Sequence, residues 1–285
     1  MPSTRTGALL ALHGAVLLFG LAGLFGKWLD LSPVLIVLGR TAVAAMALAA
    51  VRAFQRGPRL PFEPRLIGNG ILLALHWFAF FEAIRIANVA IGLLGYASFP
   101  LFVLVLERVL LGRRWAGREA ATAVLVTGGL GLLVPEFSLA NPVVQGLAWG
   151  LVCGFTFALL AVVNRSWAAG RPAIDIAFWQ NLWAALALLP LAVAAGSMPS
   201  LGLSGLGLLL ALGLVCTAFA HTLFIAALRR VTAHTASVIA ALEPVYGILL
   251  AVLLLGEIPG WRTVTGAVLI VGAAVFASRS GARGE

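Results

Sequence analysis

Long apolar runs, separated by short clusters of charged residues, prolines and other polar residues, extend along the whole chain. A run of roughly 20 apolar residues is long enough to cross the hydrocarbon core of a bilayer as an α-helix. The pattern therefore predicts an all-α integral membrane protein with ten transmembrane helices. The predicted segments are Gly7–Trp28, Pro33–Phe54, Leu66–Ile86, Asn88–Leu111, Gly117–Val134, Pro142–Ser166, Ala173–Ala194, Gly202–Leu228, Thr232–Leu255 and Gly260–Ser278.

The composition agrees with this pattern and excludes a soluble fold. Of the 285 residues, 62% are hydrophobic and 10% are charged, whereas soluble domains carry roughly half and a quarter. Ten crossings use about 200 residues, which leaves no room for a separate soluble domain. Residues 1–285 are therefore predicted to form one membrane domain.

The basic residues are distributed unevenly between the predicted loops. With the N-terminus in the cytoplasm, 15 of the 19 Lys and Arg residues lie in cytoplasmic segments, and Arg40 lies within the second helix. Only Lys27, Arg85 and Arg262 lie on the outer side. Because positive residues collect on the cytoplasmic side of membrane proteins, we predict a multi-pass protein of the inner (plasma) membrane with both termini cytoplasmic. The net charge of +9 is then explained by topology in a lipid bilayer, without a nucleic-acid partner.

An internal repeat becomes visible when the chain is aligned with itself at an offset of 144 residues. The offset superposes Pro100 on Pro244, Gly112 on Gly256, Arg118 on Arg262, Gly128 on Gly272 and Arg85 on Arg229. This predicts two repeats of five helices, over residues 7–134 and 142–278. Because five is odd, the second repeat enters the membrane from the opposite side, an inverted arrangement typical of carriers that work by alternating access.

The sequence around the second proline resembles a known family. The run Leu242-Glu243-Pro244-Val245-Tyr246, followed by Leu254-Leu255-Gly256-Glu257, is similar to the repeat signature of EamA-type proteins in the drug/metabolite transporter superfamily. The first half keeps Pro100 and Gly112 but has Phe99 in place of the glutamate. The ten helices and an aromatic-rich middle further resemble the YddG-like aromatic amino-acid exporters. The resemblance implies ten helices around a central cavity.

The third predicted helix contains the most informative polar residue. It reads His76-Trp77-Phe78-Ala79-Phe80-Phe81, and the aligned part of the eighth contains His221. An imidazole deep in a bilayer is costly unless it faces the bundle or water. His76 is therefore a candidate substrate-binding residue, with Trp77 and Phe80 supplying aromatic faces for an apolar substrate group. The alternative for His76 is a structural hydrogen bond to a backbone carbonyl. His221 carries the same two alternatives.

The bend prolines and their neighbouring tyrosines are a second group of candidates. Pro100 and Pro244 lack a backbone N–H and should bend the fourth and ninth helices, freeing a carbonyl at mid-depth. Tyr96 and Tyr246 stand near these bends and either bind a polar substrate group or satisfy the freed carbonyl.

Further aromatic residues of the second half are candidates for the wall of a substrate site. Trp149 and Trp179 are the first choices, and packing or lipid contact is the alternative for each. In the seventh helix, Gln180 and Asn181 are suited either to bonding another helix or to an amide contact with a substrate. Gly128 and Gly272 are expected at close helix contacts.

Two charged residues lie inside predicted helices. Glu243 directly precedes Pro244, and an isolated carboxylate there must be protonated, paired or solvated. It either couples proton movement to transport or pairs with a cation such as Arg40. Arg40 either binds a substrate carboxylate or extends toward the outer interface along its apolar stem.

Motifs for several other chemistries are missing from the sequence. We find no phosphate-binding G-x-x-x-x-G-K-[ST] loop, no H-E-x-x-H metal helix and no G-x-S-x-G nucleophile motif. We therefore predict no catalytic residues, no metal and no cofactor.

The sequence thus predicts a secondary transporter that exports small amphipathic metabolites, with amino acids, including aromatic or apolar ones, as the leading substrates. One alternative is a drug or other metabolite carrier of the same superfamily. Another is a membrane enzyme acting on lipid-linked substrates. A functional monomer is expected.

The charge distribution gives a direct test of topology. We expect green fluorescent protein fused to the C-terminus to fluoresce, because the C-terminus is predicted to be cytoplasmic. Alkaline phosphatase fused at Pro199, in a predicted outer loop, should be active because its disulfides form outside the cytoplasm. The reciprocal fusions are the controls, and active phosphatase at the C-terminus would contradict the prediction.

Overall fold

The structure is a computed structural model that describes residues 4–54, 61–111, 117–136, 138–168, 171–196, 201–227, 230–231 and 239–280. All its regular elements in these ranges are helices. They are α1 (Arg5–Trp28), α2 (Pro33–Phe54), α3 (Arg65–Ile86), α4 (Val89–Tyr96), α5 (Phe99–Leu111), α6 (Gly117–Leu133), α7 (Pro142–Ala168), α8 (Ala173–Ala194), α9 (Leu203–Gly213), η1 (Leu214–Phe219), α10 (Ala220–Ala227), α12 (Glu243–Leu255) and α13 (Trp261–Ser280).

These elements confirm an all-helical membrane fold. In the described residues, six helical stretches are long and apolar enough to cross a membrane, and shorter apolar helices accompany them. Every predicted segment contains an observed helix, although part of the ninth, residues 232–238, lies outside the described residues. Apolar runs fix helices well because a helix satisfies its own backbone hydrogen bonds in lipid.

The fourth segment is two helices and not one. The chain leaves the helix at Ala97 and Ser98, between α4 and α5, and the Ser98 hydroxyl donates to the Gly95 carbonyl at 2.7 Å. Pro100 falls in the first turn of α5, where its missing N–H costs little. The interruption therefore precedes the proline.

The ninth segment is interrupted in the same way. A turn at Ala241 and Leu242 comes directly before α12, and Pro244 lies in the first turn of that helix.

The eighth segment contains an irregularity that the sequence pattern did not reveal. Between α9 and α10 the backbone adopts one π-helical turn, η1. The Thr217 hydroxyl donates to the Leu212 carbonyl, five residues earlier, at 2.7 Å. Such π-turns widen the helix and often occur at functional sites.

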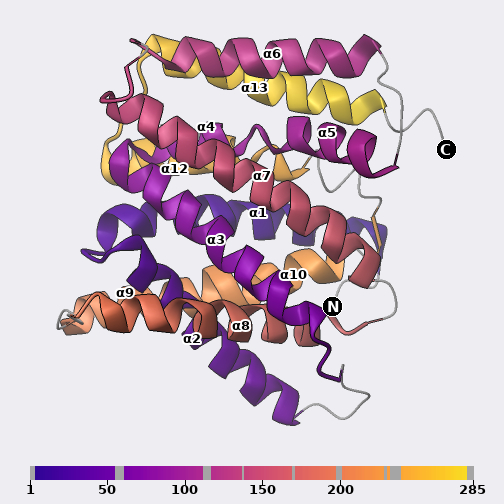
Figure 1. The fold of residues 1–285 in the computed structure, drawn as a ribbon, viewed down its shortest axis with the longest axis vertical. Helices are drawn as coiled ribbons and strands as arrows, with labels where there is room; N and C mark the ends of the chain where they lie inside the picture. The colour runs from indigo at the N-terminus through magenta and orange to yellow at the C-terminus, as the bar shows by residue number, and fades with distance from the viewer. Residues whose placement is uncertain are drawn as a thin grey trace.

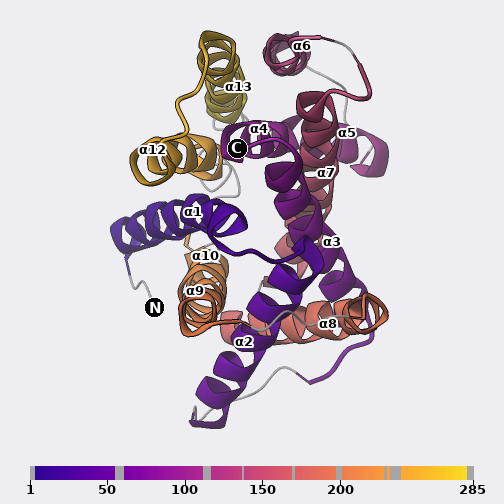
Figure 2. The same ribbon diagram turned by 90° about the vertical axis from the view of Figure 1, so that its left-hand side faces the viewer.

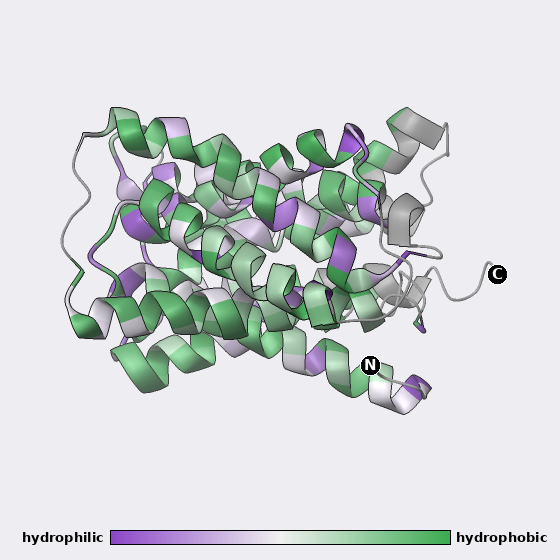
Figure 3. Cartoon of the chain, turned by 90° about the horizontal axis from the view of Figure 1, so that it is seen from below, coloured by the Kyte–Doolittle hydropathy of each residue, from purple (hydrophilic) through white to green (hydrophobic). Residues whose placement is uncertain are grey.

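The helices run roughly side by side across the longest dimension of the molecule (Figure 1). α3 packs against α7 and α8, and α1 lies between α12 and α10 (Figure 2). The pairs α6–α13 and α2–α8 occupy opposite ends of the array. Hydrophilic residues gather mainly near the helix ends, whereas the long helix surfaces are mostly hydrophobic (Figure 3). This leaves the few polar residues inside the bundle as the candidate site.

Glycines allow three helix pairs to approach closely. A Cβ atom on Gly20 of α1 would lie 2.8 Å from the backbone nitrogen of Gly247 in α12. Gly95 and Gly150 make a similar contact between α4 and α7, with the added Cβ 2.8 Å from the facing Cα.

The glycine contact between α6 and α13 corrects an expectation. It is made by Gly129 and Gly266, because an added Cβ on Gly266 would lie 2.9 Å from the Gly129 carbonyl oxygen. Gly128 and Gly272, expected at this place, have open space around them. The repeat offset identified the helices but not the face of each helix.

The contact between α1 and α12 yields a stability prediction. Gly20→Ala should lower the free energy of unfolding by about 1–3 kcal/mol, because the new methyl group meets backbone that cannot rotate away. Thermal unfolding of the purified protein measures the effect. Gly14→Ala, in the same helix with nothing within 4 Å of its added Cβ, is the matched control. Equal stability of the two variants would contradict this packing.

Candidate functional site

Aromatic rings from four helices meet at the centre of the bundle. The His76 ring of α3 lies 5.4 Å from Phe157 of α7 and 6.0 Å from Tyr96 at the end of α4. Tyr96 also contacts Phe99 of α5, at 5.4 Å, and Phe80, at 6.4 Å. We call these five residues the central aromatic cluster. The helix interruption after Tyr96 places two of its rings, Tyr96 and Phe99, on successive helices.

His76 is fixed in this cluster by one of its two ring nitrogens. It is 7% exposed, and its Nδ1 lies 3.1 Å from the carbonyl oxygen of Cys153 in α7. The structural alternative therefore describes Nδ1, which donates its proton to that carbonyl. Nε2 is then an acceptor, and no hydrogen bond to it is found within the described part of the chain.

Arg40 is a cation buried in the interior. It is 1% exposed, so it does not extend to the outer interface. Its Nε donates to the Thr217 hydroxyl at 2.9 Å, and its guanidinium lies over the Trp77 ring, 4.0 Å from the centroid. Among the described residues, no carboxylate forms an ion pair with Arg40. These neutral contacts hold the charge between α2, α3 and η1.

Glu243 is the buried carboxylate of the centre. It is 5% exposed at the first residue of α12, and the Tyr96 phenol is its side-chain hydrogen-bonding neighbour. Arg40 lies within electrostatic reach but forms no direct ion pair with it. The structure thus brings the two charges into one region and leaves them separate.

A chain of polar side chains extends from the centre. The His221 ring lies 5.9 Å from Trp77, and its Nε2 donates to the Gln180 Oε1 of α8 at 2.9 Å. The Gln180 amide donates to Asn164 of α7 at 2.6 Å, and Asn69 of α3 donates to the same oxygen at 2.9 Å. Gln180 therefore bonds other helices, one of its two predicted alternatives.

Three predicted site residues lie apart from the central aromatic cluster. Trp149 packs edge-on against Phe78, 5.4 Å away. Tyr246 bonds His13 of α1, with 2.9 Å between its hydroxyl and Nδ1.

Trp179 belongs to a separate group near the start of α8. Its ring contacts Phe62 at 5.6 Å, and the Arg52 guanidinium lies 5.6 Å from its centroid. Arg52 also forms an ion pair with Asp175. This group links α2 to α8 away from the centre.

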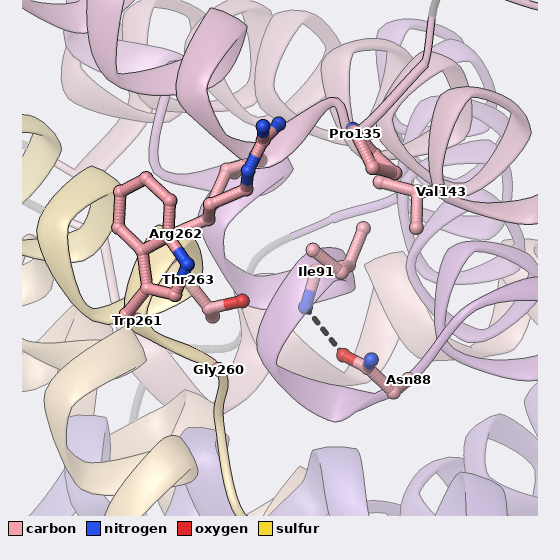
Figure 4. Close-up of a pocket in the computed structure, with 9 residues that line it drawn as sticks. Asn88, Ile91, Pro135, Val143, Gly260, Trp261, Arg262 and Thr263 are labelled. Atoms are coloured by element: carbon pink, nitrogen blue, oxygen red, sulfur yellow. Dashed lines mark hydrogen bonds between the residues drawn. The ribbon is translucent and has the colours of Figure 1, made fainter.

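A surface pocket occurs where the α3–α4 connection, the α6–α7 connection and the start of α13 meet. Arg262 and Thr263 border one side of it, and Pro135 and Val143 border the other (Figure 4). It shares no residue with the central aromatic cluster, and Arg262 donates to a backbone carbonyl beside it, that of Val134, at 3.2 Å. We assign it no role in the site.

Several residues of the centre were not predicted. Thr217 and the Cys216 carbonyl contact Arg40, and Asn69 and Asn164 end the polar chain. Each is a polar group in an otherwise apolar run, which is the signal that could have identified them.

The helices and their buried polar centre define a multi-pass α-helical membrane protein. The EamA-like transporter family matches the sequence twice, over residues 5–134 and 144–279. The chain therefore belongs to the EamA-like transporter family, which confirms the resemblance to EamA-type proteins of the drug/metabolite transporter superfamily.

Similar proteins of known name are transport proteins or related membrane proteins. Protein RarD of Salmonella typhi is 27% identical over 96% of this chain and 95% of its own length. The pseudopaline exporter CntI of Pseudomonas aeruginosa is 29% identical over 76% of this chain and 75% of its own length. The S-adenosylmethionine uptake transporter of Rickettsia prowazekii is 27% identical over 73% of this chain and 69% of its own.

The fold also matches a solved crystal structure. That structure superposes with a TM-score of 0.71 and covers 98% of this chain and 99% of its own, at 24% sequence identity. At this identity the match supports the fold alone.

The polar chain yields a stability prediction. Gln180→Leu should lower the free energy of unfolding by about 1–2 kcal/mol, because it removes two hydrogen bonds between helices. Thermal unfolding in detergent measures the loss. Gln145→Leu is the matched control, since Gln145 is exposed and bonds only the nearby Leu139 carbonyl. A Gln180 variant as stable as this control would contradict the polar chain.

Proposed function

We propose that this protein is a secondary transporter that exports small amphipathic metabolites, with amino acids, including aromatic and apolar ones, as the leading substrates. The observation that carries the proposal is the buried centre, where the central aromatic cluster lies beside Arg40 and Glu243. Aromatic faces accommodate an apolar group, and buried polar side chains in a membrane protein mark a substrate or ion pathway.

Alternating access by two inverted repeats is the proposed mechanism. Two features of helix packing support it: α1 of the first half packs on α12 of the second, and α7 of the second packs on α4 of the first. Both pairs make a close glycine contact and involve a helix next to an interruption. Residues 7–134 and 142–278 are the proposed repeats, and one chain is the proposed functional unit.

His76, Trp77, Phe80 and Tyr96 are the proposed substrate-binding residues, with His221 at the edge of the site. Trp149, Trp179 and Tyr246 lie outside the central aromatic cluster and are proposed to act only if the helices rearrange during transport.

Carriage of another metabolite is the second candidate function. Two relatives favour it, since one is named as an exporter of pseudopaline and another as an uptake transporter of S-adenosylmethionine. These names differ in both solute and direction.

Radiolabelled amino-acid counterflow in proteoliposomes tests the proposal. Tryptophan, phenylalanine, leucine and threonine are compared, and we expect faster entry against preloaded substrate for at least one aromatic or apolar amino acid. His76→Ala and Trp77→Phe should slow that counterflow by roughly tenfold, the loss expected when a contact worth about 1.4 kcal/mol is removed.

Trp261→Phe is the matched control, because Trp261 is 70% exposed on α13. All rates are normalised to folded protein. Absence of counterflow for all four amino acids, from protein shown to be folded, would reject the amino-acid assignment in favour of another metabolite.

A further inference from the structure

The two buried charges at the centre are held apart by neutral groups. Arg40 and Glu243 come from α2 and α12, which belong to different halves of the chain. Each is at most 5% exposed, and neither forms an ion pair with the other or with any other described residue. Unpaired charges are costly in a low-dielectric interior, so both are available to a ligand that carries the opposite charges.

The surroundings of Arg40 leave part of its guanidinium free. The Thr217 hydroxyl gives its own proton to the Leu212 carbonyl, so its oxygen accepts from the Arg40 Nε. One Nη2 proton points to the Cys216 carbonyl at 3.5 Å. A guanidinium has five N–H donors, and no hydrogen bond of Nη1 is found in the described residues. The π-turn therefore orients the group without using its full donor capacity.

Trp77 fixes the plane of this guanidinium. The ring lies beneath it, with Arg40 Cζ 4.0 Å from the ring centroid. A stacked guanidinium keeps its donors in the plane of the group, at its edge, where a carboxylate is bound by two parallel hydrogen bonds.

Glu243 is oriented by two interrupted helices. It starts α12 directly after the turn at Ala241 and Leu242, and its neighbour Tyr96 is the last residue of α4. A carboxylate beside a phenol retains acceptor sites, since a carboxylate has about four lone-pair positions. These sites suit an ammonium group.

Apolar surface lies between the two charged groups. Tyr96 stands 5.2 Å from Phe157 and 6.0 Å from His76, and His76 precedes Trp77 on α3. A ligand that reaches from the Arg40 edge to Glu243 therefore passes the central aromatic cluster.

We propose that the substrate is bound as a zwitterion: Arg40 binds its carboxylate, Glu243 with Tyr96 binds its ammonium group, and the central aromatic cluster holds its apolar side chain. This inference rests on the proposed transport of amino acids and assigns the charge recognition. A ligand with one charge leaves the other protein charge uncompensated, and sites built on buried polar groups reject ligands that lack a partner for them.

The test compares three probes that share one phenyl group. Phenylalanine carries both charges, phenethylamine lacks the carboxylate, and 3-phenylpropionate lacks the amine. For each, the concentration that gives half the maximal rise in unfolding temperature is measured on the purified full chain, because a ligand stabilises the state that it binds. We expect phenylalanine to act at a concentration at least tenfold lower than either analogue.

Two variants separate the two contacts. In Arg40→Gln the advantage of phenylalanine over phenethylamine should fall to threefold or less. In Glu243→Gln the advantage over 3-phenylpropionate should fall in the same way. Arg85→Gln and Glu82→Gln are matched controls, because these residues form an ion pair at the end of α3, and both ratios should stay as in the unchanged protein.

A double variant keeps the test decisive if a single variant fails to fold. Arg40→Gln with Glu243→Gln removes both charges, so no uncompensated charge remains to unfold the protein. We expect it to fold and to bind the three probes within threefold of one another. If it keeps a tenfold preference for phenylalanine, the two charges only hold the helices, and the inference is overturned.

The outcomes also separate this inference from the proposed function. If no amino acid drives counterflow, the proposed function fails. If phenylalanine drives counterflow but phenethylamine and 3-phenylpropionate bind the unchanged protein as tightly, transport stands and the zwitterion inference alone is overturned.

Discussion

The position of one guanidinium constrains the centre of this molecule. Arg40 lies where no water shell is available to it, so protein groups must surround the charge. It joins α2 to the π-turn through Thr217 and to α3 through Trp77. The ring of Trp77 in turn contacts His221 on α10. Three helices and the π-turn are therefore arranged around a single cation, and the helix surfaces that face it cannot be repacked independently.

The irregular parts of the backbone occur in the same region as these polar groups. A chain in lipid must satisfy its own backbone hydrogen bonds, and interruptions are tolerated only where protein covers them. The break after α4 is covered by the Ser98 hydroxyl, and the π-turn by the Thr217 hydroxyl. Interruption and polarity thus coincide, as expected for a family of carriers whose solutes contact the interior of the bundle.

The candidate site was partly predictable from residue type. His76 and Glu243 stand out because polar groups are rare in apolar helices, and the structure places both at the centre. Trp149 and Trp179 did not stand out from other aromatics, and both lie elsewhere. Packing and site aromatics have the same composition signal, so only the contacts distinguish them. Thr217 was missed because a hydroxyl is cheap enough to occur in any helix.

The sequence by itself determined the helices, the family and the presence of two unusual charges. Apolar run length decides whether a segment crosses a bilayer, and this information is local. The tertiary structure decided which helix faces meet. It placed the glycine contact at Gly129 instead of Gly128, and it set Arg40 near Glu243 without pairing them. These outcomes depend on the rotation of each helix against its neighbours, which is fixed by side-chain packing over the whole bundle.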